Sequence, residues 1–209
     1  MSEQKPLQRA VVRHDKESLP QAISLYSSAF KDDPVITYML NNFTEEARLA
    51  YLPSYFRAIL TAAALNKAII ADVADWQCCG FLMPPGEKVD NPMTWKTLFE
   101  YTPVSDKAKV KALGKSKYYY VFFIGTSADS RKQGLASIVI KDFQAQAAAE
   151  KLPVWLEATT TYSRDLYEKL GFQVVEEMVI GQGTCSPDGL PSRGGPGVPI
   201  WGMIWRPQS

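Results

Sequence analysis

The sequence predicts an α/β protein, because strands and helices alternate through its second half. Residues 118–125, YYYVFFIG, are apolar or aromatic throughout and predict a central strand that is buried on both faces. The strand–helix–strand unit that starts there requires a parallel pair between residues 118–125 and 153–158. The 209 residues fit a single large domain, 1–209, with a sizeable core.

In the first half, β-branched residues predict a strand over residues 7–13. A helix is expected to begin after Ser18, which suits an N-cap, with Pro20 in its first turn. The same helix should end near Lys31, because Asp33 precedes a proline and is pushed out of the helical region.

A longer helix is predicted to begin at Thr44, with acidic residues in its first turn, where the helix dipole favours them. Pro53 lies inside its apolar pattern and predicts a kink or a break. Two strands joined by a short turn follow over residues 67–73 and 77–83, and one or two short helices are expected over residues 91–117.

The remaining elements alternate between apolar stripes at helical spacing and short apolar runs. Gly171 is a helix-ending signal, and six glycines and four prolines mark the loop near the C-terminus. The predicted elements are a helix over 133–150, a strand over 153–158, a helix over 162–170, a strand over 172–180, a loop over 181–199 and a strand over 200–205.

Composition excludes several classes of protein. Lysine and arginine number 23 against 22 acidic residues, so no polyanionic partner such as nucleic acid is expected. Three cysteines, two of them adjacent, suit neither a disulfide framework nor a zinc site, and no metal is predicted. His14 is the only histidine, which nearly excludes a histidine-based catalytic dyad. Without an apolar leader or a membrane-spanning run, we expect a cytoplasmic protein that does not bind membranes.

The junction after the aromatic strand, TSADSRKQGLA at 126–136, carries the most chemical information. The first turn of a helix presents unpaired backbone N–H groups and positive partial charge, which together attract an anion. Gly134 and Ala136 are small enough for a diphosphate to approach the backbone. Strand–turn–helix junctions with small residues are also common in proteins without such a site. The two other glycine-rich phosphate motifs, those of P-loop and dinucleotide-binding proteins, are absent.

Three motifs in order resemble the GNAT superfamily of N-acetyltransferases. Residues 131–136, RKQGLA, resemble its Arg/Gln-x-x-Gly-x-Gly/Ala signature, residues 156–158, LEA, its fifth strand, and residues 166–172 its LYEKLGF segment. The ending at 199–203, PIWGM, is similar to that of puromycin N-acetyltransferase and its fungal relatives within this superfamily.

The resemblance implies a GNAT-type mixed, splayed sheet of about six to seven strands flanked by helices. It implies acetyl-CoA as cosubstrate, with pantetheine against the backbone at 124–126 and pyrophosphate on the N–H groups of 132–137. The cofactor-binding residues that it implies are Ile124, Gly125, Thr126, Arg131, Lys132, Gln133, Gly134, Leu135, Ala136 and Ser137.

Two residues are candidates for catalysis. The resemblance gives Tyr167 the role of the acid that protonates the departing thiolate, and the alternative is a tyrosine that only packs. Glu157 is the candidate general base, since burial in an apolar strand would raise its pKa. The alternative for Glu157 is a salt bridge or a solvated carboxylate.

The acceptor is expected to be a small-molecule amine, bound by Phe30, Asp33 and Trp201. Asp33 could hold a cationic substrate or simply end its helix, and Trp201 could line the acceptor site or only pack. The alternatives are acetylation of a protein N-terminus or lysine, and a non-catalytic CoA-binding module. A loop at 181–199 that covers the pocket would disfavour an open peptide groove. The protein is expected to be a monomer or a homodimer.

Overall fold

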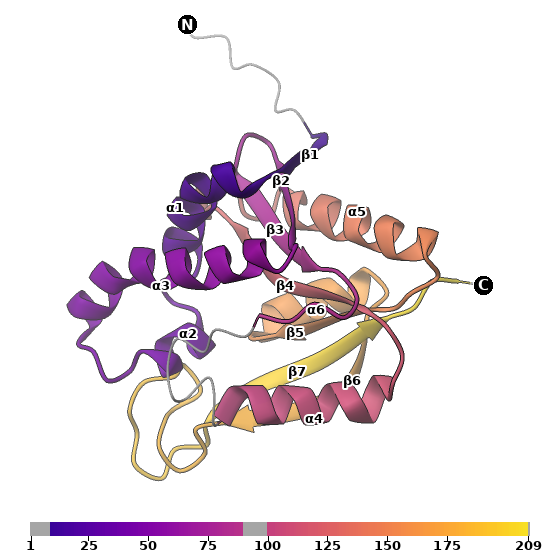
Figure 1. The fold of residues 1–209 in the computed structure, drawn as a ribbon. Coiled ribbons are helices and arrows are strands. Elements are labelled where there is room, and N and C mark those ends of the chain that lie inside the picture. The colour runs from indigo at the N-terminus through magenta and orange to yellow at the C-terminus, as the bar shows by residue number, and fades with distance from the viewer. Residues whose placement is uncertain (1–8, 90–99, 209) are drawn as a thin grey trace, which may run out of the picture.

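A computed structural model describes residues 9–89 and 100–208, which form a mixed β-sheet with helices on both faces (Figure 1). The strands are β1 (Val11–His14), β2 (Ile69–Val73), β3 (Cys78–Met83), β4 (Tyr119–Thr126), β5 (Val154–Ala158), β6 (Gln173–Ile180) and β7 (Val198–Trp205). Within the described residues the sheet has seven strands in the order β1-β2-β3-β4-β5-β7-β6. The predicted mixed sheet flanked by helices is therefore confirmed.

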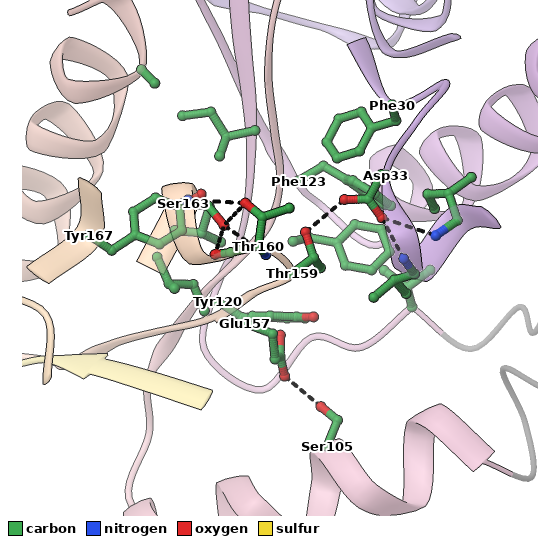
Figure 2. Close-up of a pocket in the computed structure, with 18 of the residues that line it drawn as sticks. Phe30, Asp33, Ser105, Tyr120, Phe123, Glu157, Thr159, Thr160, Ser163 and Tyr167 are labelled. Atoms are coloured by element: carbon green, nitrogen blue, oxygen red, sulfur yellow. Dashed lines mark hydrogen bonds between the residues drawn. The ribbon is translucent and has the colours of Figure 1, made fainter. Parts of the chain in front are cut away.

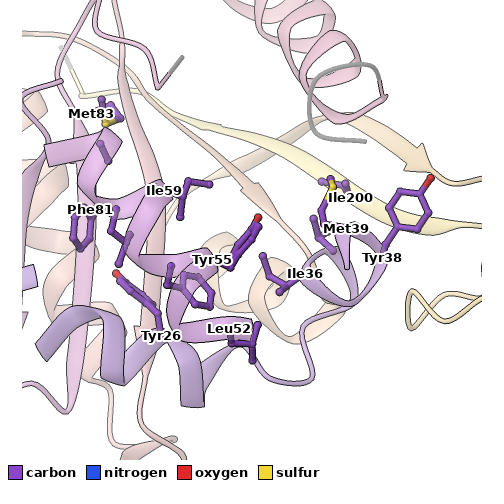
Figure 3. Packing of buried hydrophobic residues seen from close by; sticks show 14 of the residues in the cluster. Tyr26, Ile36, Tyr38, Met39, Leu52, Tyr55, Ile59, Phe81, Met83 and Ile200 are labelled. Carbon is purple, nitrogen blue, oxygen red and sulfur yellow. The ribbon is translucent and has the colours of Figure 1, made fainter. Parts of the chain in front are cut away.

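Two layers of helices cover the sheet, and each encloses its own core cluster. The helices are α1 (Leu19–Ala29), α2 (Pro34–Met39), α3 (Glu45–Leu65), α4 (Thr102–Leu113), α5 (Leu135–Ala149) and α6 (Thr161–Lys169). Apolar residues of α1 to α4 pack on one face, whereas α5 and α6 pack on the other. The first cluster includes Tyr26, Leu52 and Phe81 (Figure 3).

The central strand β4 serves both clusters, as its sequence predicted. Tyr119 and Val121 face the α5 and α6 side, whereas Tyr120, Phe122 and Phe123 pack against the opposite cluster. Two consecutive residues share one face because the pairing with β3 shifts register here, where Phe81 pairs with Phe123 but the next residue of β3 pairs with Val121. This β-bulge turns an extra aromatic side chain toward the helices α1 and α3.

The sheet splits in its middle, between β4 and β5. These two strands form the only parallel pair among the described strands, and they pair at only two positions, Tyr119 with Val154 and Tyr120 with Trp155. Beyond Tyr120 the strands diverge, so the facing backbone N–H and C=O groups of β4 and β5 do not hydrogen-bond to each other there. Both the parallel pair and the predicted splay are confirmed.

Two local features of the helices differ from the sequence expectations. Pro53 was expected to kink or break its helix, but it does not break α3, which continues over 21 residues from its Thr44 cap. Asp33 lies outside the helical region, as predicted, with φ of −68° and ψ of 128°, but it also caps a short helix that was not predicted, α2, whose first residue is Pro34. Proline is well suited to a first helical position, because its missing N–H would have no partner there anyway.

Other elements lie close to their predicted bounds. The first strand is Val11–His14 rather than 7–13, and residues 7 and 8 lie outside the described part of the chain. One helix, α4, falls within the predicted 91–117 region, of which 91–99 are not described. Gly171 ends α6 as predicted, with a positive φ of 86° and with Phe172 N–H bonded to the Tyr167 carbonyl. No helix in the described residues is long and apolar enough to cross a membrane.

Candidate active site

A cavity of about 1010 Å³ lies where β4 and β5 part, and it has two ends. One end is formed by the turn at 130–137, before and at the start of α5, and we call it the cofactor half. The other end is formed by the α1–α2 junction, α3 and α4, and we call it the acceptor half. Tyr167 and the end of β5 also line the cavity, and Figure 2 shows them with Asp33.

The cofactor half ends on the first turn of α5. Gly134 adopts a left-handed conformation with φ of 79°, and a Cβ atom there would meet no atom within 4 Å. The N–H of Ile138 bonds to the Gly134 carbonyl at 3.2 Å, so the N–H groups of Leu135, Ala136 and Ser137 precede the first such bond of the helix. This turn therefore offers open space and positive partial charge to an anion.

The turn before α5 is braced from two sides. Gln77 in the β2–β3 turn accepts hydrogen bonds from the Ser127 and Ser130 hydroxyls at 2.7 and 2.6 Å. The Arg131 guanidinium donates to the Ala29 carbonyl at the end of α1, at 3.0 Å. Sequence reasoning missed Gln77, because it lies about fifty residues before the turn. Arg131 lines the cavity and also holds α1 in place.

The residues predicted to contact the cofactor divide into two groups. Those that line the cavity are Ile124, Thr126, Arg131, Lys132, Gly134, Leu135, Ala136 and Ser137. Gly125 and Gln133 are not among the described lining residues. A Cβ atom at Gly125 would lie 2.7 Å from the Tyr26 ring, so this glycine is needed for the close approach of α1. The Gln133 side chain donates to the Asp129 carbonyl at 3.3 Å.

Tyr167 projects from α6 into the middle of the cavity (Figure 2). Its side chain is buried, and burial raises the pKa of its phenol above the ordinary value. No residue in the described ranges hydrogen-bonds its hydroxyl. The helix is positioned by a capping box in which Thr160 and Ser163 each bond to the other's backbone N–H. The phenol therefore stays protonated and can donate a proton to a ligand.

Glu157, the predicted general base, is already engaged by its neighbours. Its side chain is 3% exposed, and its Oε1 accepts hydrogen bonds from Ser105 at 2.5 Å and from the Trp155 indole at 2.8 Å. Lys109 Nζ lies 3.3 Å from the same oxygen. Burial alone would raise the pKa of Glu157, but Lys109 and the hydrogen bonds outweigh it and lower the pKa. The expectation of a raised pKa is therefore wrong, and the salt-bridge alternative describes Glu157.

Sequence reasoning missed the two α4 residues that hold Glu157. Ser105 and Lys109 are four residues apart, so they lie on one face of the helix. Lys109 also lies 4.1 Å from the centroid of the Tyr120 ring. The four-residue spacing of Ser105 and Lys109 can be seen in the sequence. No sequence feature, however, indicated that this face of α4 packs against β5.

Asp33 joins three elements at the acceptor half. Its Oδ1 caps α2 by accepting the N–H groups of Val35 and Ile36, both at 3.0 Å. Its Oδ2 accepts the Thr159 hydroxyl, from the end of β5, at 2.7 Å (Figure 2). Burial raises the pKa of Asp33 despite these three hydrogen bonds, each of which lowers it. Asp33 therefore both caps a helix and lines the cavity.

The other two predicted acceptor residues lie in different places. Phe30 lines the cavity, and its ring centroid lies 5.4 Å from that of Phe123. Trp201 is not among the described lining residues. It packs in the α5 and α6 cluster, with the Arg164 guanidinium 5.1 Å from its ring centroid. The packing alternative thus describes Trp201, because the β7 face it occupies is opposite to the α1 to α4 layer.

The loop after β6 does not line the cavity, so it gives no argument against an open peptide groove. None of the residues at 181–197 is among the lining residues. This loop packs on α2 instead, where the Asn41 side chain donates to the Gly189 carbonyl at 3.0 Å. A Cβ atom at Gly189 would lie 2.2 Å from the Pro34 carbonyl oxygen, so only glycine fits this contact.

The cavity suits a thioester cosubstrate with a diphosphate. The unpaired edges of β4 and β5 can hydrogen-bond an extended chain, and the first turn of α5 can hold an anion. The gap beside Ile124 is open, since that residue lines the cavity. Within the described ranges, no group of three or more histidine, cysteine or acidic side chains is placed to hold a metal.

Comparisons with known proteins agree with this geometry. The model of the acetyltransferase (GNAT) family matches residues 80–172. An uncharacterised N-acetyltransferase of Schizosaccharomyces pombe is 22% identical over 183 residues, which cover 78% of this chain and 74% of that protein.

Solved structures show the same fold. One, described as histone acetyltransferase HPA2 and related acetyltransferase from Corynebacterium glutamicum, has a TM-score of 0.67 at 18% identity over 96% of this chain and 97% of that one. Mosquito arylalkylamine N-acetyltransferase-like 5b has a TM-score of 0.62 at 13% identity over 94% and 100%. The GNAT acetyltransferase family model thus covers residues 80–172 of the chain, and the fold of the described residues is that of GNAT acetyltransferases.

Proposed function

We propose that this acetyltransferase moves the acetyl group of acetyl-CoA onto a small-molecule amine. Its structural relatives include one described as a histone acetyltransferase and one described as an arylalkylamine N-acetyltransferase, so the proposal rests on this chain's own cavity. The observation that carries it is one continuous cavity that joins an anion-binding turn to an acceptor half walled by α1, α2, α3 and α4. Helices on several sides suit a compact acceptor better than an extended peptide.

Each part of the cavity has a task in this reaction. Acetyl-CoA supplies the activated acetyl thioester when it is bound. The N–H groups of Leu135, Ala136 and Ser137 hold its diphosphate, and the free edges of β4 and β5 hold its pantetheine arm. Tyr167 donates its phenolic proton toward the departing sulfur, which it can do because its raised pKa keeps it protonated.

Glu157 fits a positioning role in this scheme. A carboxylate that accepts two hydrogen bonds and an ion pair, with a lowered pKa, is a weak proton acceptor. Its contacts fasten α4 to β5 and so shape the floor of the acceptor half (Figure 2).

The test combines a binding measurement with an activity measurement. Saturating CoA should raise the melting temperature of the protein, since a ligand that binds only the folded state stabilises it. Release of free thiol from acetyl-CoA should then depend on an added amine. Tyr167→Phe should keep CoA affinity and lose about 100-fold or more in kcat. Tyr162→Phe, an exposed tyrosine on the same helix, is the matched control.

Three outcomes would contradict the proposal. An unchanged melting temperature with CoA would remove the cofactor site. Full activity of Tyr167→Phe would remove the phenol from the mechanism. Thiol release that requires a peptide N-terminus or a protein lysine, and that no free amine supports, would show a protein acetyltransferase instead.

A further inference from the structure

The acceptor half contains one carboxylate oxygen with room for another hydrogen bond. An ionised carboxylate has about four lone-pair sites. Asp33 uses two on Oδ1, for the N–H groups of Val35 and Ile36, and one on Oδ2, for the Thr159 hydroxyl. The fourth site, on Oδ2, has no partner among the described residues. Because Asp33 lines the cavity, this site is available to a ligand N–H.

The other acidic residues that line the cavity are paired or exposed. Glu157 pairs with Lys109, and Glu87 pairs with Lys67 at 2.6 Å. Asp32 and Asp106 are exposed. Within the described part of the chain, Asp33 is therefore the only carboxylate in the cavity that is both sheltered from water and without a cationic partner.

Apolar and aromatic side chains surround this carboxylate. Phe30 and Phe123 lie beside Asp33, as Figure 2 shows, and Ile36, Met39 and Tyr55 extend the same wall between α2 and α3 (Figure 3). Such a wall binds a hydrocarbon or aromatic group and also stabilises a neighbouring cation. Among its described residues, the wall contains no further carboxylate that could pair with a second cationic group on the same ligand.

On the basis of the proposed function, we propose that the acceptor is a monoamine on an aromatic or aliphatic body, whose ammonium group binds Asp33 Oδ2 and gives its proton to that oxygen. The choice of a single positive charge rests on the carboxylates, since the described lining residues include no second carboxylate that is both sheltered and without a cationic partner.

Asp33 and Tyr167 together account for every proton that moves in the reaction. Asp33 Oδ2 takes one proton from the ammonium group, which leaves a neutral amine with a free electron pair. The nitrogen forms its bond to the acetyl carbon as the carbon–sulfur bond breaks, and the sulfur keeps that electron pair. The sulfur receives a proton from Tyr167, which recovers one from the amide nitrogen as the product forms. Asp33 finally releases its proton to water.

The environment of Asp33 suits proton acceptance better than that of Glu157. A general base works best when its pKa lies near the working pH. Burial raises the pKa of Asp33, whereas Lys109 lowers that of Glu157. The titratable groups that face Asp33 are Tyr55 from α3, Tyr101 just before α4 and Tyr167 from α6, and each has a raised pKa, so none of them titrates at mildly acidic pH.

The first experiment measures acceptor preference. Initial rates of thiol release are compared for 2-phenylethylamine, hexylamine, spermidine and a short peptide with a free N-terminus. We expect kcat/KM for the first two amines to exceed that for spermidine by about 10-fold or more, which is the effect of one unfavourably placed charge. A preference for spermidine or for the peptide would overturn the proposal.

The second experiment compares Asp33→Asn with Asp75→Asn. Asparagine is as good an N-cap as aspartate, so α2 should persist, but the amide cannot accept a proton. We expect Asp33→Asn to lower kcat/KM for 2-phenylethylamine by about 100-fold or more and to leave the CoA Kd unchanged. Asp75→Asn removes an exposed carboxylate in the turn between β2 and β3, which is not among the described lining residues of the cavity, and should stay within about twofold of the wild type. Equal activities of the two variants would overturn the proposal.

The third experiment separates proton acceptance from a structural role. The hydrogen bond from Thr159 lowers the pKa of Asp33, so Thr159→Val should raise it. The acidic limb of the kcat/KM profile should then move to higher pH in Thr159→Val and disappear in Asp33→Asn. An acidic limb that is identical in all three proteins would show that Asp33 is not the proton acceptor.

The outcomes also distinguish this inference from the proposed function on which it rests. If CoA binds but no amine supports thiol release, the proposed function fails and this inference fails with it. If amines are acetylated but Asp33→Asn behaves like Asp75→Asn, or spermidine is preferred, only this inference fails.

Discussion

The two halves of the cavity are built from different parts of the polypeptide. The cofactor half consists mainly of backbone: the free edges of β4 and β5 and the first N–H groups of α5. The acceptor half consists of side chains that come from four helices, among them Asp33 at the start of α2 and Lys109 on α4. The first half is specified by one stretch of sequence, whereas the second depends on residues far apart in the chain.

This difference predicts how each half responds to mutation. Backbone donors are kept when a side chain is exchanged, so the cofactor half should tolerate most substitutions. The acceptor half contains buried charges that depend on one another, so its substitutions should change both stability and activity. Five measurements, in order of decreasing effect, can break or support this contrast.

Lys109→Met should produce the largest loss of stability. It leaves the Glu157 carboxylate buried without its cation, which typically costs about 3–5 kcal/mol of unfolding free energy. The double variant Lys109→Met/Glu157→Gln should recover part of that loss, because no buried charge remains. Urea denaturation of the three proteins at pH 7 measures both effects, and a single variant as stable as the wild type would show that the pair is not buried in solution.

The pH dependence of this pair has a defined sign. The folded-state pKa of Glu157 is lowered, so the pair stabilises the wild type above the unfolded-state pKa of about 4.3 and the stability falls as pH drops through the folded value. In Lys109→Met the largest cause of that lowering is gone, so stability should instead fall as the pH rises from 4 toward 7. Unfolding free energies measured across that range distinguish the two slopes.

Ala136→Pro should produce the largest effect in the cofactor half. It removes one N–H from the first turn of α5, and a hydrogen bond to a charged group is worth about 1.5–3 kcal/mol, or about 10- to 100-fold in CoA affinity. The helix should persist, since α1 carries Pro20 at the same second position. Ala136→Ser keeps the N–H and is the control. Calorimetric CoA titration of both variants makes the measurement, and equal affinities would contradict a backbone anion site.

Asp33→Asn should slightly stabilise the protein at neutral pH. The folded-state pKa of Asp33 is raised, so its ionisation favours unfolding as the pH rises above the unfolded-state value of about 3.9. We expect the melting temperature at pH 7 to rise by a few degrees and the difference from the wild type to vanish near pH 3. A lower melting temperature at pH 7 would show that the three hydrogen bonds of the carboxylate outweigh its burial.

Lys132→Ala should produce the smallest effect. Lys132 is exposed, so its attraction for a diphosphate is screened and is worth about 0.2–1 kcal/mol, which is less than about sixfold in CoA affinity. The difference should decrease further as salt is added. An effect larger than that of Ala136→Pro would reverse the contrast between the halves.

The fold and the cofactor half could largely be predicted from the sequence. Three local signals made this possible: the aromatic run of β4, the small residues before α5 and the Gly171 helix stop. A local signal can be interpreted without knowing which distant residues pack against it. Helix α2 was missed because the Asp-Pro pair was interpreted only as a signal that ends α1, whereas α1 ends at Ala29 and Asp33 caps α2. The integrity of α3 at Pro53 was also missed, because the packing of a long helix overrides a local preference.

The sequence alone therefore determined the order of the elements, the parallel pair at the centre of the sheet and the helix start that can hold an anion, since each follows from residues adjacent in the chain. Only the tertiary structure decided which charged groups meet. It joined Lys109 to Glu157 across 48 positions, placed Asp33 beside Thr159, and turned Trp201 into the opposite layer. The pKa of a carboxylate depends on burial and on nearby charge, and both are properties of contacts between distant segments.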